Sequence, residues 1–175
     1  MLRSTLKAVA TPTFQLAKRG VQIEARLAQR GIQLSDPVPP KGNYVPAVRS
    51  GNTLFLAGHI PLMPDNNLAK GKVGKDVTPE QANAIARQVA INILSTLKVE
   101  LGDLDRVTRI VKLVGFVNCT DDFTGQPGVI NGASDLFVEV FGKKGVHARS
   151  AVGTNALPLG IPVEIEAVIE FSEDE

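Results

Sequence analysis

The chain has few of the residues that build covalent or metal-linked frameworks. Its 175 residues include one cysteine, Cys119, two histidines, one tyrosine and no tryptophan. A single cysteine excludes an intrachain disulfide and any cysteine-rich zinc or iron–sulfur site. Two histidines cannot complete a four-ligand metal shell without help from carboxylates. We therefore expect chemistry that uses no metal.

Long apolar runs are also missing. Lys, Asp, Gly or Pro interrupts the apolar stretches every few positions, and none approaches the roughly 20 residues that cross a bilayer. With 43% hydrophobic and 21% charged residues, the chain is long enough to bury one core. The sequence predicts one globular domain and no membrane partner.

Acidic residues are absent before Glu24, whereas this stretch holds four basic residues and several Ser and Thr. A basic, hydroxyl-rich, amphipathic start is typical of a mitochondrial transit peptide, and a disordered basic tail is the alternative. We expect residues 1–22 to be a targeting segment and the protein to reach the mitochondrial matrix, with a cytoplasmic location as the alternative. Removing its four cations from the 19 leaves 15 basic against 18 acidic residues, a net charge of about −3. This balance argues against nucleic acid as a partner.

Residues 23–175 predict one domain, with a short helix over 23–34, a proline-rich linker to 41 and a core over 42–171. Strands over 44–48 and 53–57 form an opening hairpin. Thr78-Pro79-Glu80-Gln81 has the pattern of a helix capping box, and the apolar spacing that follows continues to a C-cap at Gly102. The rest predicts a strand over 106–119, a helix over 128–141, and strands over 147–155 and 162–171.

The order β-β-α-β-α-β-β predicts an α+β fold with two helices on one face of a mixed sheet. In the last strand apolar residues alternate with three glutamates, so one face belongs to the core. The strand over 106–119 is apolar on both faces toward its end. We therefore expect a second subunit to cover part of the open face, in a closed homo-oligomer.

Arg149 and Glu164 are the strongest candidates for chemistry. If the last two strands form a hairpin, these residues lie near each other across it and share one pocket. A guanidinium binds a carboxylate through two parallel hydrogen bonds, and a nearby glutamate can orient water or move a proton. The alternative is a surface salt bridge of about 0–1 kcal/mol.

The run His147 to Phe171, HARSAVGTNALPLGIPVEIEAVIEF, closely resembles the carboxy-terminal signature of the RidA/YjgF (endoribonuclease L-PSP-like) family of reactive-intermediate deaminases. The segment YVPAVRSGNTLFLAGHIPL resembles the opening hairpin of that family, and Val129-Ile130-Asn131 opens the second helix. The resemblance covers about residues 42–171. The amino-terminal helix and residues 122–142 resemble the longer, less-characterised branch of the family.

This resemblance implies a chorismate-mutase-like fold and a homotrimer, with the sheets packed around a central barrel and clefts between subunits. It implies hydrolysis of enamine or imine intermediates, such as 2-aminoacrylate or 2-iminobutanoate, to 2-oxo acids and ammonia without a cofactor. The small imino- or oxo-acid ligand would be bound through its carboxylate by Arg149, and Glu164 would hold the catalytic water. The remaining cleft positions match Tyr44, Gly58, Asn131 and, through its backbone, Ala151.

Three positions depart from the family pattern. Ala57 stands in place of a serine, His59 in place of a glutamine and Ala151 in place of a cysteine, so hydroxyl and thiol contacts are lost while backbone contacts remain. A non-catalytic trimer that binds a small carboxylate through Arg149 is the alternative function. A pericyclic mutase of the same fold is a third hypothesis, which calls for more cations in the cleft.

Overall fold

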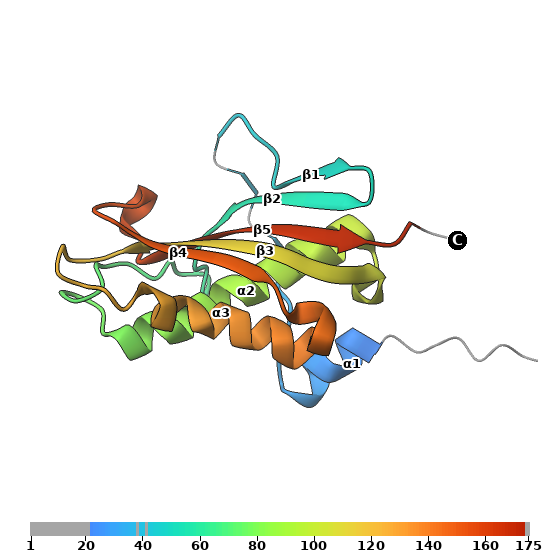
Figure 1. The fold of residues 1–175 in the computed structure, drawn as a ribbon, viewed down its shortest axis with the longest axis horizontal. Coiled ribbons are helices and arrows are strands. Elements are labelled where there is room, and N and C mark those ends of the chain that lie inside the picture. Colours follow the sequence, from blue (N-terminus) through green and yellow to red (C-terminus); the bar gives the residue numbers. More distant parts are fainter. Residues whose placement is uncertain (1–21, 38, 41, 174–175) are drawn as a thin grey trace, which may run out of the picture.

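A mixed five-stranded sheet forms one layer of the protein, and helices α2 and α3 form a second layer on one of its faces (Figure 1). The computed structural model describes residues 22–37, 39–40 and 42–173. After the leading helix α1, the described chain follows the predicted order β-β-α-β-α-β-β. The helices and strands are α1 (Gln22–Gln29), β1 (Ala47–Ser50), β2 (Thr53–His59), α2 (Pro79–Leu101), β3 (Val107–Asn118), α3 (Gln126–Phe141), β4 (Ala148–Thr154) and β5 (Val163–Phe171).

The sheet has the strand order β1-β2-β5-β3-β4. β4 runs parallel to β3, while β5 runs antiparallel to both β2 and β3. The predicted hairpin between the last two strands is therefore wrong, because β3 lies between β4 and β5. α3 is the crossover that brings β4 back parallel to β3 at the sheet edge, and β5 then enters the centre, where its apolar face is buried.

α2 begins and ends as the sequence predicts. The Thr78 hydroxyl accepts a hydrogen bond from the backbone N–H of Gln81 at 3.2 Å, and the Gln81 side chain accepts one from the Thr78 N–H at 2.9 Å. Gly102 closes the helix with a φ of 75°. The buried face of α2 packs against β5 and α3, so this helix positions the layer that covers the sheet.

Replacing Thr78 by alanine should lower the free energy of unfolding by about 1 kcal/mol, because the N–H of Gln81 loses its capping acceptor. Urea denaturation measures the change. Thr154→Ala is a control, since that hydroxyl donates to Ala156 in a surface turn rather than to a helix end. An unchanged urea midpoint of unfolding for Thr78→Ala would show that the cap contributes nothing to stability.

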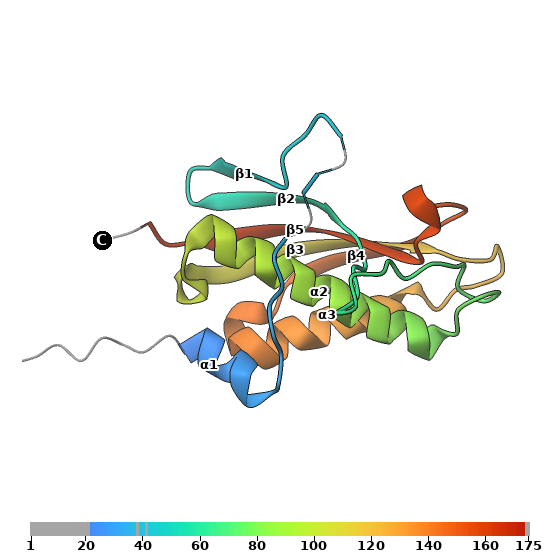
Figure 2. The ribbon, with the colours of Figure 1, turned by 180° about the vertical axis from the view of Figure 1, so that it is seen from behind.

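α1 is shorter than predicted, because Gly31 turns the chain with a φ of 67° soon after the helix ends. The Asp105 carboxylate accepts hydrogen bonds from the N–H groups of Gln22 and Ile23, and Arg30 pairs with Glu139 of α3 at 2.6 Å. From α1 the chain crosses α2 toward β2 (Figure 2). The predicted targeting segment lies outside the described residues, apart from Gln22.

The opening hairpin is also shifted from its prediction. Its first strand begins at Ala47, after Pro46, rather than at Tyr44. Tyr44 therefore lies in the loop before β1, where its side chain is half exposed.

Apolar side chains remain on the sheet face that the helices do not cover. Val48, Phe55 and Val152 are each about half exposed there, in β1, β2 and β4. Phe55 lies opposite Val168 of β5, and Val152 lies opposite Phe116 of β3. The open face thus carries aromatic and branched side chains across the width of the sheet.

Candidate functional site

Arg149 lies on the edge strand β4 and faces α3. It is opposite Leu113 of β3, which is fully buried beneath the helices, so Arg149 lies on the same, helix-covered face. Its Nη1 donates to Asn131 Oδ1 at 2.8 Å and to Ser134 Oγ at 2.9 Å, and its Nη2 donates to the Pro127 carbonyl at 3.2 Å. These three bonds fix the plane of the guanidinium at the edge of the sheet. Among the described residues no carboxylate forms an ion pair with it, which contradicts the salt-bridge alternative.

Ser134 and His147 continue the hydrogen-bond network of Arg149. His147 Nδ1 lies 2.6 Å from the Gly145 carbonyl, and because a carbonyl only accepts, Nδ1 carries the proton. His147 Nε2 then accepts from the Ser134 hydroxyl at 3.0 Å, which leaves the Ser134 oxygen to accept from Arg149. Burial, with a smaller contribution from the Arg149 charge, lowers the pKa of His147, so the ring is neutral at pH 7. The hydrogen bonds therefore run in one direction, from the guanidinium through Ser134 and His147 to the Gly145 carbonyl.

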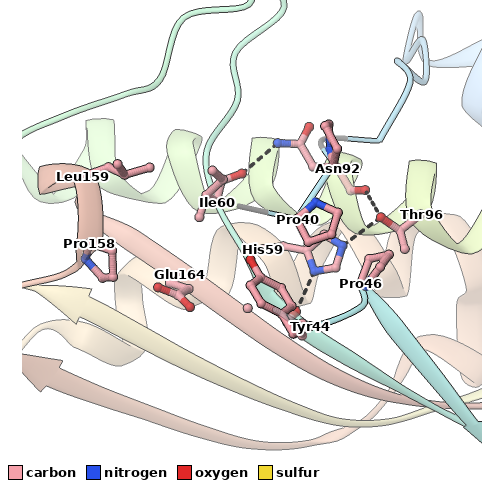
Figure 3. Close-up of a pocket in the computed structure, with 13 residues that line it drawn as sticks. Pro40, Tyr44, Pro46, His59, Ile60, Asn92, Thr96, Pro158, Leu159 and Glu164 are labelled. Atoms are coloured by element: carbon pink, nitrogen blue, oxygen red, sulfur yellow. Dashed lines mark hydrogen bonds between the residues drawn. The ribbon is translucent and has the colours of Figure 1, made fainter. Parts of the chain in front are cut away.

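Glu164 lies on the central strand β5 and lines a cavity of about 380 Å³. Figure 3 shows its carboxylate between Pro158 and Tyr44. A Cβ at position 58 would collide with Glu164 Oε1, so the carboxylate rests on Gly58. Burial raises the pKa of Glu164, and the charge of Glu166 raises it further. The group is thus suited to accept a proton and return it.

The wall of this cavity beside α2 is polar but saturated with hydrogen bonds. His59 Nδ1 donates to the Ala57 carbonyl at 2.7 Å, so its Nε2 accepts from the Thr96 hydroxyl at 2.8 Å. Asn92 donates to the carbonyls of Ile60 and Leu62, both at 3.0 Å. Burial lowers the pKa of His59 and keeps it neutral. His59 therefore braces the wall and is not a free acid or base.

Within one chain the predicted site residues form two separate groups. Arg149 is opposite Leu113 on β3 and Glu164 is opposite Phe116, three residues further along the same strand. Because side chains alternate between faces, this odd spacing places Arg149 and Glu164 on opposite faces of the sheet. The expectation that they share one pocket across a hairpin is wrong. Tyr44 and Gly58 belong with Glu164, while Asn131 and Ala151 belong with Arg149.

Sequence reasoning missed several residues of both groups. Ser134 lies three positions after Asn131, a spacing that places both on one helix face and could have indicated a shared contact. His147 gave no such signal. Four apolar residues that line the cavity have sequence contexts that indicate only a linker or a turn: Pro39, Pro40, Pro158 and Leu159.

The described residues contain no group of three or more His, Cys, Asp or Glu side chains arranged to hold a metal ion. None of the helices in this part of the chain has both the length and the hydropathy needed to span a bilayer.

Comparison with known proteins identifies the family to which this fold and sequence are similar. Residues 24–169 match the protein family described as "YjgF/chorismate_mutase-like, putative endoribonuclease". Protein TCP17 of Trypanosoma cruzi is 42% identical over 152 residues, which cover 86% of this chain and 95% of that protein. The crystal structure of Atu1372, a protein of unknown function from Agrobacterium tumefaciens, is 43% identical, with a TM-score of 0.80 and coverage of 86% and 92% of the two chains.

Two more distant relatives carry informative names. A 2-iminobutanoate/2-iminopropanoate deaminase of Dermatophagoides farinae is 27% identical, over 78% of this chain and 93% of that protein. Protein MMF1, mitochondrial, of Saccharomyces cerevisiae is 27% identical, over 82% and 90%. The fold, the matched family and the relatives agree, and the chain belongs to the YjgF/chorismate mutase-like family.

Proposed function

We propose that the protein hydrolyses reactive enamine or imine intermediates, of the 2-aminoacrylate or 2-iminobutanoate type, to 2-oxo acids and ammonia. The observation that carries the proposal is the presence of two incomplete groups of site residues, which we call half-sites: one around Arg149 and one around Glu164. Arg149 is an oriented guanidinium without a carboxylate partner among the described residues, and Glu164 is a cavity carboxylate with a raised pKa. The deaminase among the relatives supports this reaction.

The two groups complete one site only if they come from different subunits. Arg149 and Glu164 cannot meet within one chain, because they lie on opposite faces of the sheet. The apolar side chains on the open face support association of that face with other copies. In the proposed homotrimer, each cleft receives Arg149, Asn131 and Ala151 from one subunit and Tyr44, Gly58 and Glu164 from the next.

The reaction in this cleft is a hydrolysis in two steps. Arg149 binds the substrate carboxylate through two parallel hydrogen bonds and orients the C=N carbon. Glu164 removes a proton from water as the oxygen attacks that carbon and passes this proton to the imine nitrogen, which gives a neutral carbinolamine. Glu164 then takes the hydroxyl proton as the carbonyl forms and the C–N bond breaks, and it gives this proton to the leaving nitrogen, which departs as ammonia.

A coupled assay tests the proposal. A dehydratase acting on serine or threonine generates the imine in place, and the rate of 2-oxo acid release is compared with and without the protein. Acceleration above buffer is the expected result. No acceleration by folded, oligomeric protein would refute the deaminase and favour a carboxylate-binding protein.

Ser134→Ala should raise KM by roughly three- to tenfold and leave kcat nearly unchanged, because Arg149 loses one of its fixed hydrogen bonds. Ser95→Ala is a matched control, since the Ser95 hydroxyl donates to Ile91 of its own helix, far from Arg149 in the chain. Steady-state kinetics separates the two parameters. A fall in kcat of roughly three- to tenfold with no change in KM would show that Ser134 does not act through carboxylate binding.

For the localisation we propose mitochondrial targeting by residues 1–22, which the mitochondrial relative supports. Expression of the full chain fused to a fluorescent protein would test it. Cytoplasmic fluorescence of the fusion would contradict the targeting role.

A further inference from the structure

The cavity around Glu164 is larger than the smallest imines require. Its volume of about 380 Å³ falls in the range of roughly 300–1,000 Å³ that is typical of pockets for drug-sized ligands. The imines formed by dehydration of serine and threonine are among the smallest imino acids, and their carboxylate would be held by Arg149 of the neighbouring subunit. Much of the cavity is therefore available to a substrate side chain.

The walls that face this space are mostly apolar and rigid. They include four prolines, Tyr44 and the half-exposed Leu159. Proline has no N–H to donate and a ring that fixes its backbone, so such walls offer surface but few hydrogen bonds. The prolines are Pro39, Pro40, Pro46 and Pro158.

The polar side chains of the wall beside α2 are already paired. His59 and Thr96 bond to each other, and Asn92 bonds to two backbone carbonyls. A polar substrate side chain against this wall would give up water without new partners there, which costs free energy. Glu164 would repel an acidic side chain. An apolar side chain gains free energy in proportion to the area it buries.

Leu159 supplies an independent observation. Its φ is 61°, in the left-handed region, where a leucine costs about 1–2 kcal/mol. The side chain is 50% exposed, so burial in the core does not offset this cost. Strained residues of this kind cluster at sites that hold ligands. Leu159 lies beside Pro158 in the lining of the Glu164 cavity, which is such a site (Figure 3).

The amino-terminal segment brings two of the prolines to the cavity. α1 is fastened to the rest of the protein by Asp105 and by the Arg30–Glu139 pair, and Ile32 and Leu34 pack against the core. The chain then crosses α2 and places Pro39 and Pro40 at the cavity wall. The segment before the hairpin thus forms part of the cavity.

We infer that the cavity selects imino acids with bulky apolar side chains, branched aliphatic or aromatic, and that Leu159 is a residue that determines this specificity. The inference rests on the proposed deaminase function. It assigns the substrate carboxylate to Arg149 and the substrate side chain to the proline and leucine walls beside Glu164.

One amino-acid oxidase of broad specificity can generate the imines of alanine, leucine, phenylalanine and arginine for a comparison of kcat/KM. We expect the leucine and phenylalanine imines to exceed the alanine imine by about tenfold or more, the discrimination typical of apolar pockets. Equal values for alanine, leucine and phenylalanine would overturn the inference while leaving the deaminase intact. The highest value for arginine would overturn it as well, in favour of a pairing with Glu164. No turnover of any imine would refute the proposed function itself.

Leu159→Gly tests the wall directly. The ratio of leucine-imine to alanine-imine kcat/KM should fall from about ten toward one, while the melting temperature does not fall, because glycine adopts the left-handed conformation without strain. Val138→Ala, which trims an exposed apolar side chain of α3, should change neither the ratio nor the rates. An unchanged ratio in folded Leu159→Gly would contradict the assignment of Leu159.

Discussion

Replacement of Arg149 by lysine should lower kcat/KM for imine hydrolysis by roughly 100-fold, although the positive charge is kept. The guanidinium is held in one plane by bonds to Asn131, Ser134 and the Pro127 carbonyl. Lysine cannot make this set of bonds and also present two parallel donors to a carboxylate. Most of the loss should appear in KM, because the contact to the carboxylate exists before the reaction begins.

The measurement is steady-state kinetics in the coupled assay, together with the melting temperature. Arg109→Lys is the matched control, because Arg109 is an exposed arginine of β3 that belongs to neither half-site. We expect Arg109→Lys to keep the wild-type activity. Nearly full activity of Arg149→Lys would contradict the role of Arg149 as a bidentate anchor.

Glu164→Gln should reduce kcat by roughly 10²- to 10⁴-fold with little change in KM. Glutamine keeps the shape of the side chain over Gly58 but cannot take a proton from water. At neutral pH the variant should be at least as stable as the wild type. The folded-state pKa of Glu164 is raised, which means that its ionised form is disfavoured by folding, and glutamine removes that cost.

The pH profile adds a second signature of Glu164. Because burial raises its pKa, the acid limb of kcat should lie above the ordinary carboxyl range, and activity should be lost as the pH falls through that limb. Glu166→Gln is the matched variant. It keeps Glu164 and its burial but removes the charge that raises its pKa further, so the limb should move to lower pH with activity retained. A limb that does not move in Glu166→Gln and persists in Glu164→Gln would assign it to another group.

The helices and the order of elements were predictable because their signals are local. The capping box at Thr78 and the left-handed glycine at position 102 act within a few residues of themselves, so the sequence indicates both ends of α2. The neighbours of β4 and β5 in the sheet were not predictable in the same way. Neighbouring strands often pair, and nothing in the alternation within β5 indicates that β3 would lie between them.

The same distinction between local signals and strand pairing applies to the site. The residue types of Arg149 and Glu164 suggest anion binding and proton transfer, and the family resemblance singles them out. Their placement on opposite faces depends on strand order and register, which local sequence does not encode. The left-handed Leu159 was unpredictable for another reason, because leucine disfavours that conformation and only its surroundings impose it.

The most direct test of a shared cleft combines two inactive proteins. Arg149→Ala and Glu164→Ala, each with a different affinity tag, are expressed together, and complexes that contain both chains are purified through both tags. In a closed trimer of mixed composition, one cleft of the three has an intact Arg149 on one side and an intact Glu164 on the other, so activity should return to about one third of the wild-type value. Mixed complexes as inactive as either parent would contradict a site shared between subunits.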